Sequence, residues 1–156
     1  MNTPSQAQVR RAIAEAQTIV VKVGSSSLTK PSGHLDPERL NAHVAALARV
    51  RLKGGSVVHV SSGAIAIGTR KLRLEQRPDQ LRGKQAVAAA GQRMMMHVYD
   101  KLFSEYNRTV AQILLTGEDV DAPVRAEHLH NTFESLLELG VIPVVNENDS
   151  VSSAEI

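Results

Sequence analysis

The sequence predicts an α/β fold, in which a three-layer αβα sandwich surrounds a largely parallel sheet. Segments of strand length alternate with segments of helical pattern along the whole chain. The strand segments are continuous apolar, β-branched runs, which are typical of parallel strands covered on both faces. The 156 residues are 42% apolar and 22% charged, which is the balance of one globular domain or one lobe of a larger domain.

The first third of the chain predicts a helix, a strand and a second helix. Residues 6–16 have helical composition, and the run 18–23 predicts a buried strand that ends at Gly24. A loop rich in Ser, Gly and Pro follows to about His34. Asp36 suits a helix N-cap and Pro37 the first helical position, so a helix begins there. Its predicted apolar stripe is Leu40, Val44, Leu47 and Leu52, and Gly54-Gly55 ends it.

The rest of the chain continues the alternation. Three further strands are predicted, and each is followed or preceded by a helix. In order, the predicted elements are a strand at 57–60, a helix that starts within 61–66, a connector at 77–79, a long helix at about 79–106, a strand at 109–115, a helix at 126–139 capped by Gly140, and a strand at 141–145 that leads into the polar segment 146–149.

Composition excludes several classes of protein. Cysteine is absent, so disulfides and thiolate metal sites are impossible. The net charge is only +2, and no basic run is interleaved with aromatic residues, so nucleic-acid binding is not predicted. No apolar run reaches the ~18 residues that span a membrane. His128 and His130 are two positions apart, so they point to different sides of their helix and indicate no metal site. We expect a soluble, cytoplasmic protein.

Small and polar residues follow three of the four predicted strands. These segments are Gly24-Ser25-Ser26-Ser27, Ser61-Ser62-Gly63 and Asn146-Glu147-Asn148-Asp149. In parallel α/β sheets, ligands bind at the carboxyl ends of the strands. The sequence therefore predicts a binding site where these three segments meet.

Two features near the end of the first strand fit a phosphate group. Lys22 interrupts an apolar strand, where its ammonium group would neutralise a transferring phosphoryl group or, alternatively, reach solvent from an edge position. Gly24 with Ser25 and Ser26 offers backbone amides to phosphate oxygens, although the same residues also suit an ordinary polar turn.

The other two segments fit an amino-acid ligand. Ser62, Gly63 and Ala64 lie at a strand-to-helix junction that favours an anion such as a substrate carboxylate, or serve as an ordinary Ser N-cap. Asp149 suits an ammonium group, and the amides of Asn146 and Asn148 suit a polar ligand. The alternative for this segment is an Asx-type turn.

Five ordered blocks resemble the amino-acid kinase family. The opening block, 20–26, is shared widely in that family, whereas the blocks at 60–66, 84–92 and 144–151 are more specific to the branch that acts on glutamate. The remaining block is Gln112-Ile113-Leu114-Leu115-Thr116. Together they cover nearly the whole chain and occur in the family's order.

The resemblance implies phosphoryl transfer from ATP to the side-chain carboxylate of glutamate, which gives γ-glutamyl phosphate, the first intermediate of proline synthesis. Mg²⁺ would accompany ATP, and no residue is assigned as a metal ligand. Feedback inhibition by proline and assembly into homo-oligomers are further traits that the resemblance implies. Catalysis would rest on positioning and charge stabilisation rather than on a covalent enzyme intermediate.

The resemblance also implies residue roles. Lys22 would contact the ATP phosphates and stabilise the transferring group, and the backbone of Gly24, Ser25 and Ser26 would line the phosphate path. Ser62, with the amides of Gly63 and Ala64, would hold glutamate. Asp149, with Asn146 and Asn148, would bind the amino group of the substrate and outline its pocket.

The chain stops at Ile156, before the Asp/Asn-rich segment, the second catalytic lysine and the nucleotide-binding half that the family possesses. We therefore expect residues 1–156 to be a truncated, amino-acid-binding lobe with an exposed sheet edge and negligible activity alone. Three alternatives stay open. They are an amino-acid kinase for N-acetylglutamate, aspartate, carbamate or a nucleotide; a non-catalytic glutamate- or proline-binding or assembly module; and a generic nucleotide binder, which the lack of a phosphate-loop motif disfavours.

Overall fold

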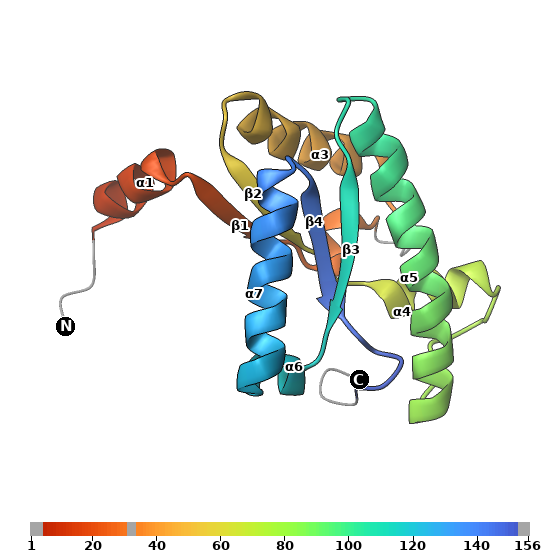
Figure 1. Cartoon of the computed structure of the whole chain (residues 1–156). Helices are drawn as coiled ribbons and strands as arrows, with labels where there is room; N and C mark the ends of the chain where they lie inside the picture. Colours follow the sequence, from red (N-terminus) through yellow and green to blue (C-terminus); the bar gives the residue numbers. More distant parts are fainter. Residues whose placement is uncertain (1–4, 31–33, 153–156) are drawn as a thin grey trace.

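Every strand pairing in the sheet is parallel. The computed structural model describes residues 5–30 and 34–152. Its sheet has the order β1-β2-β4-β3, so the last strand in the sequence lies between two earlier ones (Figure 1). The strands are β1 (Thr18–Lys22), β2 (Ser56–Val60), β3 (Val110–Leu115) and β4 (Ile142–Glu147). The prediction of a largely parallel sheet is confirmed.

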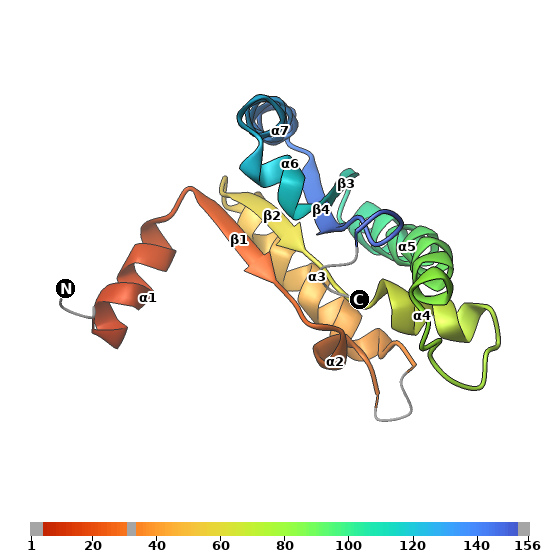
Figure 2. The same ribbon diagram turned by 90° about the horizontal axis from the view of Figure 1, so that it is seen from below.

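Helices cover the sheet from both sides. The helices α3 (Pro37–Leu52) and α5 (Leu81–Ser104) lie against one face, and α7 (Pro123–Glu138) with the short α6 (Gly117–Asp121) lies on the other (Figure 2). The αβα sandwich is therefore confirmed. Asp36 caps α3 by accepting hydrogen bonds from the amides of Glu38 and Arg39, with Pro37 at the start of the helix, as predicted.

The main core lies between the sheet and the α3–α5 layer. Leu40, Val44 and Leu47 of α3 pack there with apolar residues of β2 and β4 and with the aromatic rings of α5. The fourth residue of the predicted stripe, Leu52, is 64% exposed because it is the last residue of α3 and lies beyond the part of the helix that faces the core.

The prediction that residues 18–23 form a strand buried on both faces is wrong for one face. Val21 packs against the core beside α3 and Ile19 is half-buried, whereas the alternate residue Val20 is 64% exposed. The reason lies in the sheet order, because β1 is an edge strand and α7 packs over β4. A run of β-branched residues indicates a strand, but its neighbours decide which faces are covered.

Several boundaries also differ from the predictions. The helix α1 (Gln6–Glu15) forms with a Ser5–Gln8 capping box, but none of its residues is buried and it projects away from the sheet (Figure 1). The loop predicted after Gly24 contains α2 (Ser25–Leu28). The strand β4 continues to Glu147, so Asn146 belongs to the strand rather than to the segment after it.

The helix α4 (Ala64–Lys71) lies unusually close to α5. A β-carbon added at Gly91 would overlap the carbonyl group of Ala64, and one added at Gly68 would overlap that of Val87. Buried Ala64, Ile65, Val87 and Ala88 complete this contact. The start of α4 is therefore fixed to α5 by backbone-to-backbone packing. No helix of the described segments is long and apolar enough to cross a membrane.

Candidate functional site

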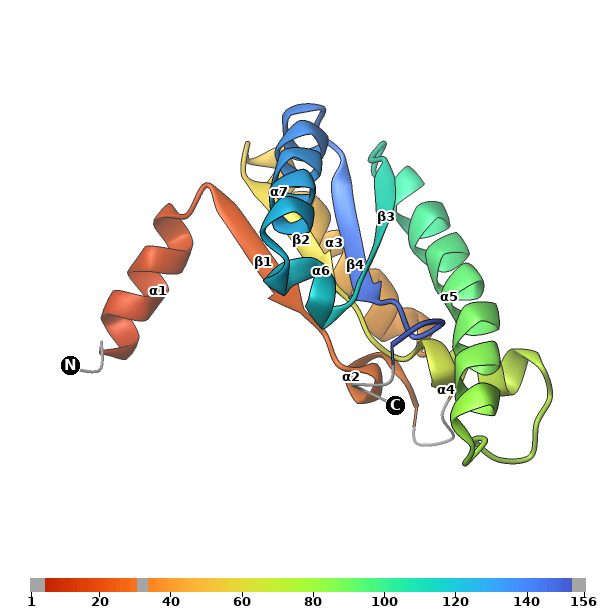
Figure 3. The same cartoon turned by 60° about the horizontal axis from the view of Figure 1, so that its bottom comes forward.

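The carboxyl ends of β1, β2 and β4 meet at one edge of the sheet. The amide of Val23 donates a hydrogen bond to the carbonyl of Val60 (2.9 Å), and the amide of Ser61 donates to the carbonyl of Val145 (2.9 Å). Figure 3 brings this edge of the sheet forward. The structure thus brings together the three polar segments that the sequence singled out.

The segment after β1 combines a lysine with the start of a short helix. Lys22 is exposed and alternates with Val21 and Val23, which pack toward the core, so its ammonium group lies on the open face of the sheet. Gly24 is the N-cap of α2, and a β-carbon there would meet nothing within 4 Å. The first amides of a helix lack intrahelical acceptors, so this segment presents backbone donors beside a cation.

The segment after β2 is tied directly to the segment after β1. The Ser62 hydroxyl donates a hydrogen bond to the carbonyl of Val23 (3.2 Å). Gly63 has a φ of 105°, and a β-carbon there would lie 2.8 Å from the β-carbon of Ser25. Only glycine permits both that backbone angle and that approach. Gly63 is also the N-cap of α4, so the alternative of an ordinary Ser N-cap does not hold.

The segment after β4 begins inside the strand and ends in a turn. Asn146 is buried, and its side-chain NH₂ group donates to the side-chain oxygen of Gln92 on α5 (2.8 Å). The Asn148 amide donates to the carbonyl of Leu115 (2.7 Å), and the Asn148 carbonyl accepts from the amides of Val151 and Ser152. Asn148 therefore anchors a turn, while Asp149 is half-buried within it.

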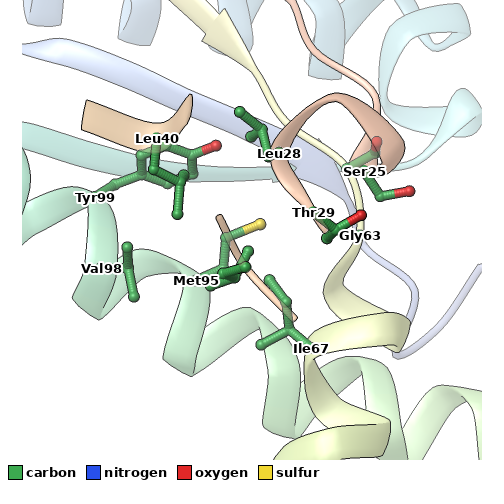
Figure 4. Close-up of a pocket in the computed structure, with 11 residues that line it drawn as sticks. Ser25, Leu28, Thr29, Leu40, Gly63, Ile67, Met95, Val98 and Tyr99 are labelled. Carbon is green, nitrogen blue, oxygen red and sulfur yellow. The ribbon is translucent and has the colours of Figure 1, made fainter. Parts of the chain in front are cut away.

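A small cavity lies between the loops that follow β1 and β2 and the helix α5. Ser25 and Gly63 border it at one end, and Met95 and Tyr99 of α5 border it at the other (Figure 4). Beside it, the buried Ser61 hydroxyl lies 3.0 Å from the Tyr99 hydroxyl and donates to the sulfur of Met95 (3.3 Å). Ser61, the residue before Ser62, is therefore held in place by two side chains of α5.

His59, which the sequence analysis did not single out, is a packing residue of unusual polarity. It is fully buried between Tyr99 (4.8 Å between ring centroids) and His43 (4.9 Å). Burial first, and the nearby His43 second, lower its pKa to about 4, although the contact with the carbonyl of Val21 acts in the opposite direction. The only signal in the sequence was a histidine inside the apolar run 57–60.

We expect acid to destabilise the protein through His59. Its pKa is about 4 in the folded protein and near 6.5 in an unfolded chain, so the unfolded state binds the proton first as the pH falls. The stabilising contribution is complete above pH 6.5 and is lost between there and about pH 4. The loss amounts to roughly 3 kcal/mol at most. Urea titrations at steps between pH 7 and pH 4.5 measure it.

The matched variant for this prediction is His59→Phe, which keeps a ring against Tyr99 and removes the titrating group. Its free energy of unfolding should depend less on pH than that of the parent chain over the same range. Burial also lowers the pKa of His43, so a smaller slope should persist. Equal slopes in parent and variant would contradict the assignment to His59.

A second polar groove, not predicted from the sequence, runs beside the turn after β4. It lies between the start of α6 and residues 148–152. The Asp119 carboxylate accepts hydrogen bonds from the Thr116 hydroxyl and amide (2.8 Å each), and these, with Arg125 at 3.0 Å, lower its pKa. Over residues 5–30 and 34–152, no three His, Asp or Glu side chains are grouped to hold a metal ion.

A parallel α/β sheet whose strands end in small polar loops is the architecture of a ligand-binding αβα protein. Residues 17–156 match the Amino acid kinase family, and the chain belongs to that family. The predicted family resemblance is confirmed.

Several curated relatives are glutamate 5-kinases. The chain is 61% identical over all its residues to the glutamate 5-kinase of Bifidobacterium adolescentis, and it covers 41% of that protein. It is 46% identical over 148 residues to that of Clostridium perfringens, covering 55% of it. The chain therefore spans about half, or less, of the length of these relatives.

A solved structure shares the fold. The UMP kinase of Ureaplasma parvum superposes with a TM-score of 0.55 at 12% identity, over 84% of this chain and 56% of that chain. At that identity the likeness concerns the fold alone.

Proposed function

We propose that residues 1–156 form the amino-acid-binding lobe of an enzyme that transfers the γ-phosphoryl group of ATP to the side-chain carboxylate of glutamate. The observation that carries this proposal is the direct bond between the loop predicted to hold glutamate and the loop predicted to face phosphate, from the Ser62 hydroxyl to the carbonyl of Val23. The 61% identity to a glutamate 5-kinase along the whole chain supports the choice of substrate.

On the amino-acid side, the proposed contacts complement both charges of glutamate. The amides of Gly63 and Ala64 stand at the start of α4, where amide groups and the helix dipole favour a carboxylate. The Ser62 hydroxyl, which donates to the Val23 carbonyl here, would turn its one hydrogen to that carboxylate when glutamate binds. Asp149 supplies the opposite charge for the substrate's ammonium group. Asn146 and Asn148 orient the ligand from the strand and turn beside it.

On the phosphate side, the donors present suit a triphosphate. Lys22 is an exposed cation, and the amides of Ser25 and Ser26 follow a glycine with open space beside it. A side-chain carboxylate oxygen of glutamate attacks the γ-phosphorus, the bond to the bridging oxygen breaks, and ADP leaves with that electron pair. Lys22 stabilises the charge that spreads over the transferred group.

The family resemblance implies that a magnesium ion accompanies ATP. In phosphoryl-transfer enzymes Mg²⁺ is held by one or two carboxylates together with the phosphates themselves.

The test uses a full-length chimera, in which this chain replaces the matching residues of the Bifidobacterium adolescentis relative. We expect ADP release that depends on glutamate, together with an acyl phosphate product that hydroxylamine traps as a hydroxamate. N-Acetylglutamate, aspartate and UMP serve as competing substrates. A chimera that prefers one of them would refute the assignment of glutamate.

The same assay addresses the remaining expectations. Proline should inhibit the chimera competitively with glutamate if it binds an overlapping site, and light scattering would detect a homo-oligomer. Compared with the full-length chimera, the isolated 156-residue chain should show negligible turnover. ATP-dependent turnover by the isolated chain would contradict the proposal that residues 1–156 form only the amino-acid-binding lobe.

A further inference from the structure

One buried contact reaches a proposed substrate residue from outside the site. We propose that Gln92 is a positioning residue for the glutamate pocket, which acts by fixing the orientation of the Asn146 side chain. The proposal rests on the proposed function, since it concerns the same pocket. Gln92 closes the specific block 84–92, to which the proposed function assigns no role.

The contact is buried on both sides. Gln92 is 7% exposed and Asn146 is 7% exposed, and the NH₂ group of Asn146 donates to the side-chain oxygen of Gln92 at 2.8 Å. Because both side chains are buried, solvent competes little with this hydrogen bond, which holds the Asn146 amide in the orientation that the structure shows. The bond uses the donor end of that amide and leaves its carbonyl oxygen as an acceptor.

An acceptor is the end of the amide that a glutamate pocket needs at this position. The proposed partner of this segment is the ammonium group of the substrate, which has donors only. Asp149 lies three residues further along the same segment and supplies a carboxylate for the same group. Gln92 would therefore select the Asn146 orientation that attracts an ammonium group rather than repels it.

Packing alone does not explain a glutamine here. The other buried residues of α5 are Val87, Ala88, Gly91, Met95, Tyr99 and Phe103. The NH₂ group of Gln92 is buried without a hydrogen-bond partner among the described residues, which costs stability that Leu or Met would not cost. A buried polar group that costs stability is expected where its side chain has a role in a functional site.

The same face of α5 also supports the neighbouring loop. Met95 and Tyr99 lie three and seven positions after Gln92, one and two helical turns along that face, and both contact the Ser61 hydroxyl. One face of α5 thus contacts the start of the loop after β2 and the end of β4, which leads into the other loop proposed to bind glutamate. Gln92 is the residue of this face whose partner is itself a proposed substrate residue.

The experiment compares variants of the full-length chimera. Gln92→Met keeps the length and helix preference of the side chain but removes its hydrogen-bonding groups. We expect the KM for glutamate to rise roughly tenfold, with the KM for ATP unchanged within about twofold, because the lost contact orients only the amino-acid pocket. Gln92→Glu keeps an acceptor for Asn146 and should restore most of the affinity for glutamate.

Two further variants separate positioning from packing. Gln17→Met makes the same exchange at an exposed position just before β1, and it should leave both KM values unchanged. Asn146→Leu removes the partner, and Gln92→Met added to it should change the KM for glutamate little further, since residues that act through one another are not additive. The double variant replaces both polar partners and so leaves neither buried group without a hydrogen bond. It can therefore still be assayed against Asn146→Leu if Gln92→Met alone does not fold.

The outcomes are distinct. A rise in the KM for glutamate alone, absent in the Asn146→Leu background, supports the proposal. An unchanged KM in folded Gln92→Met, equal losses for glutamate and ATP, or additive effects with Asn146→Leu would overturn it while the proposed function stands. A folded chimera that phosphorylates no glutamate at all would overturn both.

Discussion

Replacing Lys22 by methionine should lower the kcat of the full-length chimera by about 10²- to 10³-fold, the range observed when one preorganised electrostatic contact to a transition state is removed. The KM for glutamate should change little, because Lys22 lies on the phosphate side of the bond between Ser62 and Val23. The ammonium group is exposed at the end of an edge strand, so the neutral replacement leaves no buried charge without a partner. Steady-state kinetics with glutamate and ATP varied separately measure both parameters.

The matched control is Lys53→Met. Lys53 is exposed at the end of α3, before β2 begins, and therefore lies at the opposite edge of the sheet from the loops. The Lys53→Met substitution removes the same charge away from the site, so kcat should stay within about twofold of the parent value. If Lys22→Met and Lys53→Met have the same kcat, Lys22 has no role in the transfer.

Gly91→Ala should destabilise the folded chain by about 3 kcal/mol, a large effect for the addition of one methyl group. On helix propensity alone, alanine in the middle of α5 would stabilise the helix by up to ~1 kcal/mol. The added β-carbon would instead overlap the carbonyl of Ala64, which belongs to backbone and cannot move aside without shifting α4. Urea denaturation followed by circular dichroism gives the free energy of unfolding of parent and variant.

Gly117→Ala is the corresponding control. It lies at the start of α6, and a β-carbon there would meet nothing within 4 Å. Its free energy of unfolding should match the parent value within about 0.5 kcal/mol. Similar stability of the Gly91→Ala and Gly117→Ala variants would mean that the close approach of α4 and α5 is not a feature of the folded chain.

The long helices and the strands could be predicted because their signals are local. The periodic pattern of 79–106 and the N-cap at Asp36 predict α5 and the start of α3 within a few residues. The helix α2 has four residues, too few for a period of 3.6 to show. The exposure of Val20 depends on the order of strands in the sheet, which no stretch of sequence near it contains.

The candidate site was only partly predictable for the same reason. Small and polar residues after strands predicted which loops would meet, since all parallel strands end at the same edge. The contact of Gln92 with Asn146 joins residues 54 positions apart, and the bond from Ser62 to the carbonyl of Val23 spans 39. Neither leaves a local pattern, because both depend on how α5 and β1 lie against the ends of other strands.

The sheet order β1-β2-β4-β3 also constrains how the chain reaches its folded state. Pairing of β1 with β2 needs only the first sixty residues, but β3 has no partner in the sheet until β4 fills the gap beside β2. During synthesis, β3 must therefore wait for residues 142–147 before its register is set. Such late closure of distant contacts slows folding and prolongs the exposure of apolar surface. Assembly of the proposed glutamate pocket, whose last residues follow β4, is coupled to that final step.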